Sequence, residues 1–204
     1  MSRAIVAPGW FTCRMARLWY VSHPEVRIDG DVPVPRWGLT DHGRARAEAM
    51  CAQPWVADVE RIVSSDETKA LELAATVAAH RGLPIEVRPA TAETDRSATG
   101  FLPPAQYGPV SDRWFASPDE SPEGWEPASM VQDRITRAVE DLLRGDRNVL
   151  MAGHGGAGTL LWCRLTGESI AAAHDQPGAG HYFTVDLRTR RPLHHWRPID
   201  DIED

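Results

Sequence analysis

The amino-acid sequence predicts an α/β fold, a three-layer sandwich in which a mostly parallel sheet lies between two layers of helices. Short apolar segments typical of strands alternate with longer segments of helical periodicity along the chain. The 204 residues are 42% hydrophobic and 25% charged, which is typical of a globular protein with a core of its own. We find no internal repeat and no linker, so we expect a single domain over residues 1–204.

The first half of the chain alternates strands with helices, after a leader that we expect to be irregular over residues 1–16. Strands are expected at residues 17–22, 59–64 and 85–87. The first helix is expected to begin at Thr40, whose hydroxyl can cap it, and to end near residue 52. The second is expected over residues 67–80, where Ala and Leu are frequent and Gly82 follows as a helix terminator. This order of elements is typical of a parallel sheet.

Residues 94–125 interrupt the pattern, because they carry five prolines and no apolar periodicity. We expect an irregular insertion or lid here. Its aromatic residues Trp114, Phe115 and Trp125 could line a substrate pocket, but we favour a role in pinning the insertion to the body. The chain then resumes with the strongest helical pattern, over residues 126–144. The later elements expected are a strand at 148–153, a helix at 155–165, and strands at 182–187 and 193–196.

The charge balance restricts the class of partner. The formal net charge is -7, which argues against a general nucleic-acid binder, since such a protein needs a basic face. Of the 22 basic residues 21 are Arg, and Lys69 is the single Lys. Cys13, Cys51 and Cys163 are too scattered for a disulfide framework or a metal site. Without an apolar signal core or a membrane span, we expect a cytoplasmic protein; a homodimer remains open.

Side chains suited to phosphoryl transfer follow four of the expected strands. In chain order these are His23, Lys69, Glu93 and His154. The carboxyl ends of parallel strands meet at one edge of a sheet, so these side chains could converge on one pocket. There an imidazole can accept a phosphoryl group, cations can offset charge on its oxygens, and a carboxyl group can protonate the leaving oxygen. Gly155, at the start of a helix, can direct its N–H toward an anion.

Four segments, taken together, resemble the histidine phosphatase superfamily, which includes the phosphoglycerate mutases that depend on a cofactor. LWYVSHPEV resembles the family's opening strand with its Arg-His-Gly-Glu signature, and GLTDHGRARAEAM resembles the helix start that follows. VSSDETKALELAATVA resembles the Ser-Ser-Pro-x-x-Arg-Ala strand and helix, and NVLMAGHGGAGTLL resembles the Ser-His-Gly-Gly segment. The resemblance covers about residues 17–187 and implies a phosphoglycerate mutase-like fold.

The resemblance implies a role for several residues. His23 takes the place of the phosphorylated histidine, His154 that of the second pocket histidine, and Glu93 lies near the usual proton donor. Lys69 stands where the family has its second phosphate-binding Arg. A Lys keeps the charge but loses the planar fork that suits phosphate.

The chain also departs from the family pattern. Ser22 replaces the first phosphate-binding Arg, and Asp29 replaces an Asn. Arg27 and Arg96 are the candidates to supply the missing cation, and Arg96 is the stronger of the two.

The function that we expect is hydrolysis of a phosphate monoester through a phosphohistidine, without a metal or other cofactor. The catalytic residues would be His23, His154 and Glu93, and the ligand a small phosphorylated molecule or another anion. Substrate binding would involve the remaining candidates, Ser22, Lys69, Arg96, Arg27 and Gly155. The alternative is a catalytically impaired relative that binds an anionic ligand or a protein partner.

Two further patterns compete with this interpretation. Residues 153–158 match the glycine pattern of a dinucleotide-binding turn, with Asp175 near the separation expected for a ribose-binding acid. The expected second strand is missing and the pattern comes late in the chain, which disfavours nucleotide binding. A metal site formed by His154, His174 and Asp175 has no supporting spacing.

Overall fold

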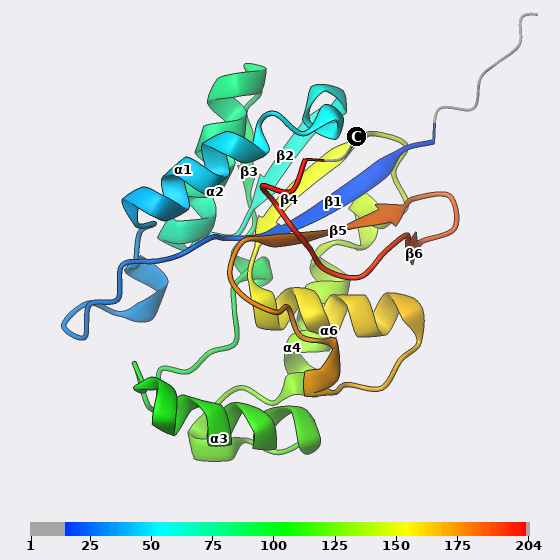
Figure 1. Cartoon of the computed structure of the whole chain (residues 1–204). Helices are drawn as coiled ribbons and strands as arrows, with labels where there is room; N and C mark the ends of the chain where they lie inside the picture. Colours follow the sequence, from blue (N-terminus) through cyan, green and yellow to red (C-terminus); the bar gives the residue numbers. More distant parts are fainter. Residues whose placement is uncertain (1–14, 203–204) are drawn as a thin grey trace, which may run out of the picture.

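The computed structural model describes residues 15–202, and within this range seven strands form one sheet. The order across the sheet is β3-β2-β4-β1-β5-β6, and β7 also pairs with β5 (Figure 1). The strands are β1 (Arg17–Ser22), β2 (Arg61–Ser64), β3 (Ile85–Val87), β4 (Val149–Gly153), β5 (His181–Asp186), β6 (Arg191–Pro192) and β7 (Arg197–Pro198). The pairs β3–β2, β2–β4 and β4–β1 are parallel, whereas β5 runs antiparallel to β1, β6 and β7. Four of the seven strands, β3, β2, β4 and β1, thus run parallel to one another, and the sheet is mostly parallel, as predicted.

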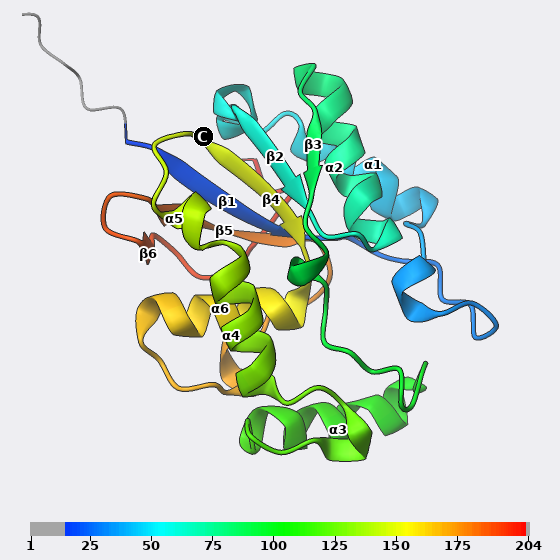
Figure 2. The same ribbon diagram turned by 180° about the vertical axis from the view of Figure 1, so that it is seen from behind.

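Helices cover both faces of this sheet. Figures 1 and 2 show α1 (Asp41–Met50) and α2 (Thr68–Arg81) on one face. On the other face lie α4 (Ala128–Ala138), α5 (Glu140–Leu143) and α6 (Gly155–Thr166). A further helix, α3 (Pro104–Ala116), packs outside α4 and α6 through a separate apolar cluster. The predicted three-layer α/β architecture is confirmed.

The alternation of side chains along β1 explains why both faces are covered. Leu18 and Tyr20 are buried in the cluster that α4, α5 and α6 share with the sheet. Trp19 and Val21 are buried in the cluster on the side of α1 and α2. Successive strand residues point to opposite faces, so a strand that is apolar throughout needs a helical layer on each side.

The helix ends on the α1 and α2 side agree with the sequence patterns. The Thr40 hydroxyl accepts a hydrogen bond from the Gly43 N–H at 2.9 Å and so caps α1. Gly82 ends α2 with a φ of 66°, a left-handed conformation that a residue without Cβ adopts at little cost.

Three predictions about regular structure were wrong. The region 94–125 is not irregular throughout, because it contains α3, in which Pro104 occupies the first turn, where a missing N–H breaks no helical bond. The helix expected over 126–144 is two helices, α4 and α5, separated at Val139 with φ −113° and ψ 4°. Residues 193–196 are not a strand; pairing falls on β6 and β7 to either side. Most of the leader, residues 1–14, lies outside the described residues.

Three aromatic residues anchor the 94–125 region to the rest of the domain, which is the role that the sequence analysis favoured for them. Trp114, Phe115 and Trp125 are buried in a cluster with α4 and α6. The indole N–H groups are also satisfied, since Trp114 donates to the Glu126 carbonyl at 2.7 Å and Trp125 donates to the Thr99 hydroxyl at 2.9 Å.

Candidate functional site

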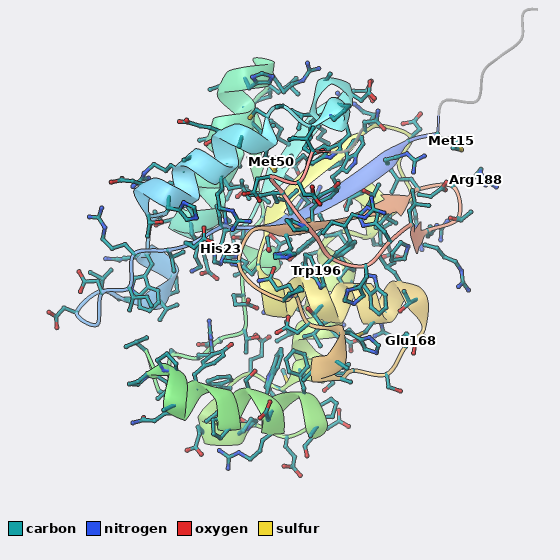
Figure 3. The ribbon with its side chains drawn as sticks, viewed as in Figure 1. Met15, His23, Met50, Glu168, Arg188 and Trp196 are labelled. Carbon is teal, nitrogen blue, oxygen red and sulfur yellow. The ribbon has the colours of Figure 1, made fainter. Side chains whose placement is uncertain are left out.

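Strand register brings the two histidines together. In the parallel pair β1–β4, Ser22 lies opposite Gly153, so the next residue on each strand is His23 and His154. The His23 N–H donates to the Gly153 carbonyl at 3.1 Å and extends the pairing by one residue. The two imidazole rings then lie with their centroids 5.4 Å apart, at an angle of 69°. Figure 3 shows His23 where β1 ends.

A hydrogen bond to one nitrogen of the His23 ring fixes which nitrogen carries the proton. Its Nδ1 lies 2.8 Å from the Pro24 carbonyl oxygen, which can only accept, so Nδ1 carries the proton. Nε2 therefore keeps its lone pair. Burial, and then the proximity of His154, lowers the pKa of His23 to about 3, despite the hydrogen bond to Pro24. The half-buried ring is thus neutral, with the lone pair of Nε2 free, throughout the neutral and mildly acidic pH range.

His154 is fully buried and is held on its backbone and on its ring. The Tyr20 hydroxyl donates to the His154 carbonyl at 3.0 Å and accepts from the His154 N–H at 3.1 Å. The ring Nε2 lies 2.7 Å from the Ser65 hydroxyl, whereas Nδ1 has no hydrogen-bond partner. Burial lowers the pKa of His154, although Glu67 and Glu93 oppose this effect.

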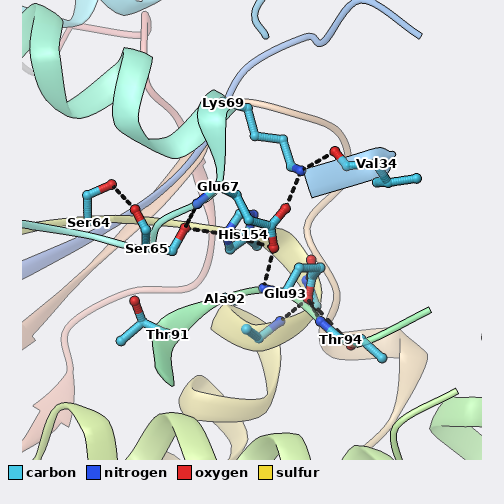
Figure 4. Close-up of polar contacts among 12 residues, drawn as sticks. Val34, Ser64, Ser65, Glu67, Lys69, Thr91, Ala92, Glu93, Thr94 and His154 are labelled. Carbon is cyan, nitrogen blue, oxygen red and sulfur yellow. Dashed lines mark hydrogen bonds and ion pairs between the residues drawn. The ribbon is translucent and has the colours of Figure 1, made fainter. Parts of the chain in front are cut away.

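Glu67, which no sequence pattern singled out, has a buried carboxylate that contacts three of the other site residues. One of its oxygens forms an ion pair with Lys69, and the other accepts the Glu93 N–H at 2.8 Å and lies 3.6 Å from His154 Nε2 (Figure 4). Lys69 also donates to the Val34 carbonyl at 3.0 Å. Burial raises the pKa of Glu67, but the charges of His154 and Lys69 and the hydrogen bonds outweigh it and bring the pKa to about 2. The only hint in the sequence was an acidic residue two positions before Lys69.

Glu93 lies beside the same histidine but is engaged as a helix cap. Its carboxylate accepts the N–H groups of Gly156 at 3.0 Å and Ala157 at 2.9 Å, in the first turn of α6. Burial opposes ionisation, but His154, Arg96 and the Thr94 N–H together lower the pKa of Glu93. The N–H groups at the start of α6, which could bind an anionic ligand, are therefore occupied by a carboxylate of the protein itself.

The backbone of the Glu93 segment is fixed from α4. The Arg134 guanidinium donates to the carbonyls of Ala90 and Ala92 at 3.0 Å each, and to that of Glu93 at 3.2 Å. It also pairs with the Glu126 carboxylate at 2.7 Å. Arg134 therefore fixes the position of Glu93 against the start of α6.

A cavity of about 730 Å³ adjoins these carboxylates. Glu67 and Glu93 line it together with residues 30–35, Asp66 and the segment 92–97, and Phe101 lines its apolar side. Among the described residues that line it, Arg96 is the single basic one. The Arg96 guanidinium lies 5.3 Å from the ring centre of Tyr107 and 5.4 Å from that of Trp125, so cation–π contacts hold it.

Of the candidate residues, Glu93 and Arg96 line this cavity, whereas His23, Lys69 and His154 do not, and neither do the remaining candidates. Ser22 is fully buried; its hydroxyl donates to the Gln176 side chain and accepts the His181 N–H at 3.1 Å. Arg27 and Asp29 are exposed, and neither lines the described cavity. Gly155 approaches the Gln176 side chain so closely that a Cβ would lie 2.3 Å from its amide nitrogen. The structure thus brings together His23, His154, Glu93 and Lys69, adds Glu67, and places Arg96 beside Glu93.

Internal packing accounts for the glycine-rich pattern that also suggested a nucleotide site. A Cβ on Gly153 would lie 2.4 Å from the Tyr20 hydroxyl, and one on Gly158 would lie 2.3 Å from the Tyr20 ring. These glycines make room for the side chain that holds His154. Asp175 accepts the Thr159 hydroxyl at 2.8 Å.

The metal alternative finds no support within the described residues. The His174 ring packs against Trp162, with ring centroids 5.0 Å apart and an angle of 35° between the planes. Residues 15–202 contain no group of three or more His, Cys, Asp or Glu side chains placed to hold a metal ion. Over the same residues, no helix is long and apolar enough to cross a membrane.

Comparisons with known proteins identify a family and several similar folds. The family model for the histidine phosphatase superfamily, branch 1, matches residues 22–188. The mycobacterial glucosyl-3-phosphoglycerate phosphatase in complex with inorganic phosphate superimposes with a TM-score of 0.75 at 22% identity, over 91% of this chain and 99% of that one. A structure described as mycobacterial hydrolase 1 gives 0.71 at 23% identity, over 90% and 96% of the two chains. A protein from Thermus thermophilus gives 0.66 at 23% identity, over 88% and 98%.

These structures share the fold of this chain. At 22–23% sequence identity the likeness concerns the fold alone. No curated protein matches the chain.

Proposed function

The chain belongs to the histidine phosphatase superfamily, and from this premise we propose that it is a phosphatase that hydrolyses phosphate monoesters through a phosphorylated His23. The observation that carries the proposal is the state of the His23 ring. Its protonated Nδ1 is bound to the Pro24 carbonyl and its pKa is lowered to about 3, so Nε2 is an unprotonated nucleophile at neutral pH. The expected ligand is a small phosphorylated molecule.

In the first step, Nε2 of His23 attacks phosphorus and the bond from phosphorus to the leaving oxygen breaks. The leaving oxygen needs a proton, and we assign its transfer to Glu93, one of the carboxyl groups that line the adjoining cavity. Its ground-state pKa is lowered, so it must first take up a proton. A bound phosphoryl group favours this, because a nearby negative charge raises the pKa of a carboxyl group.

In the second step, water attacks the phosphohistidine. The bond from nitrogen to phosphorus breaks, phosphate leaves, and the Glu93 carboxylate takes the proton of the attacking water. His154 lies next to His23 with a buried, unpartnered Nδ1, which supports a role in donating a hydrogen bond to a phosphoryl oxygen. Arg96 supplies positive charge beside Glu93, and its aromatic neighbours limit the directions in which it can move.

The test is turnover of a panel of phosphomonoesters from pH 5 to pH 8, combined with detection of an acid-labile phosphohistidine after quenching with base. We expect His23→Ala to abolish both the turnover and the adduct. The matched control is His80→Ala, which removes an exposed histidine near the end of α2 and should change neither. Full turnover by His23→Ala would contradict the assignment.

The second candidate function is binding of an anionic ligand without turnover. The observation that favours it is the engagement of two phosphate-binding positions of the family: Ser22 bonds to Gln176, and Lys69 pairs with Glu67. If the wild-type protein shows no turnover and no adduct, but phosphate esters raise its melting temperature, binding is the correct function.

A further inference from the structure

The surroundings of the Glu67 carboxylate are those of a bound anion. It is 6% exposed, and its partners are the Lys69 ammonium, the Glu93 N–H and, at 3.6 Å, Nε2 of His154. A cation, a backbone N–H and an imidazole are the groups that commonly bind a phosphoryl oxygen. Here the oxyanion that these groups surround is a side chain of the protein.

Lys69 has little capacity left for a ligand. It is 3% exposed, and two of its three donor directions are used by Glu67 and the Val34 carbonyl. The start of α6 is engaged in the same way, because the Glu93 carboxylate accepts the N–H groups of Gly156 and Ala157. These two features, which could attract an anion to the histidine pair, are thus already neutralised by carboxylates.

We propose that Glu67 is a specificity-determining residue, which fills the anion position beside Lys69 and His154 and thereby selects phosphoryl groups with one negative charge over those with two. This inference rests on the proposed function, since it takes the histidine pair as the place where the phosphoryl group binds. Glu67 and Glu93 both repel the second charge of a dianion, while the Lys69 charge that would offset it is paired. The ligand class is a phosphate ester in its singly charged form.

The experiment measures anion binding alone, so it does not depend on turnover. Sulfate, which carries two charges, and methyl sulfate, which carries one, are titrated at pH 7.5 by calorimetry. The NMR signals of the His23 ring report whether each ion binds at the histidine pair. We expect the wild-type protein to bind methyl sulfate more tightly than sulfate.

Glu67→Gln removes the charge and keeps a hydrogen-bonding oxygen of the same reach. We expect sulfate affinity to rise by about tenfold or more, which is the scale on which one charge within 4–6 Å shifts a binding equilibrium. Methyl sulfate affinity should change less. The matched control is Glu168→Gln, which makes the same charge change on an exposed residue beyond α6, away from His23 (Figure 3). It should leave both affinities unchanged.

A double variant, Glu67→Gln with Lys69→Met, shows whether the freed ammonium is the source of the gain. We expect it to lose the increase in sulfate affinity. The proposal is overturned if Glu67→Gln gains no sulfate affinity, or if the control gains as much. Should Glu67→Gln fail to fold, the wild-type comparison decides, because sulfate binding as tight as that of methyl sulfate overturns the proposal. A sulfate gain in a protein without phosphatase turnover would refute only the proposed hydrolysis.

Discussion

Tyr20→Phe removes the one hydroxyl that holds the backbone of His154. In the folded protein the Tyr20 ring is buried, stacked on Phe183 at 5.1 Å and edge-on to Trp196 at 6.0 Å. Burial raises the pKa of Tyr20, so the group is a neutral donor and acceptor at every relevant pH. The ring keeps its packing in the Phe variant, and only the two hydrogen bonds to His154 are lost.

The loss in the free energy of unfolding depends on which hydrogen-bond partners the His154 carbonyl and N–H keep in the variant. The His154 carbonyl also accepts the Gly158 N–H at 3.0 Å, so it loses one of two partners, at a cost of about 1 kcal/mol. The buried His154 N–H loses its partner, at a cost of about 1–3 kcal/mol. The free energy of unfolding should therefore fall by about 3 kcal/mol, which for a chain of this size lowers the melting temperature by roughly 6–12 °C.

Differential scanning calorimetry and urea unfolding measure this change directly. The matched control is Thr76→Val in α2, which also removes a hydroxyl bonded to a backbone carbonyl, that of Glu72 at 3.1 Å, on a half-buried helix position. The control should cost less than about 0.5 kcal/mol. If Tyr20→Phe costs no more than Thr76→Val, the reasoning about the buried His154 N–H is refuted.

Two further predictions concern His23 and Gly158. The pKa of His23 lies near 3 in the folded protein against 6.5 ordinarily, so the unfolded chain binds more protons between these values. The contribution of His23 to the free energy of unfolding is complete above pH 6.5 and falls, by at most about 1.4 kcal/mol per pH unit, as the pH drops toward 3. Urea unfolding of His23→Gln should therefore show a weaker dependence of the free energy of unfolding on pH. An equal dependence in the variant and the wild type would be inconsistent with the lowered pKa. Gly158→Ala places a Cβ 2.3 Å from the Tyr20 ring and 2.7 Å from Trp196, and should cost about 1–3 kcal/mol. Gly108→Ala in α3, where a Cβ meets nothing within 4 Å, should be neutral or stabilising in the same melting assay, and equal effects would contradict the packing argument.

The order of elements and the place of the histidines could be predicted because both depend on local patterns. Apolar runs ended near residues 22 and 153, and a parallel sheet aligns such ends at one edge. The register of the parallel pair β1–β4 then brings His23 and His154 side by side, with ring centroids 5.4 Å apart. The helix α3 escaped prediction because its prolines are typical of loops, although the one in its first turn is compatible with a helix.

The composition of the chain drew attention to Lys69 as its single lysine, and the resemblance placed it at a phosphate-binding position. The sequence by itself thus determined the fold class, the family and the pair of histidines, since strand ends and helix starts carry these features in consecutive residues. Only the tertiary structure decided what Lys69 binds, namely a carboxylate two positions earlier and a carbonyl from residue 34. The same carboxylate accepts an N–H from residue 93, so three separate segments meet there. Whether a buried cation pairs with the protein or with a ligand depends on the distances and burial of groups far apart in the chain, and no local pattern encodes them.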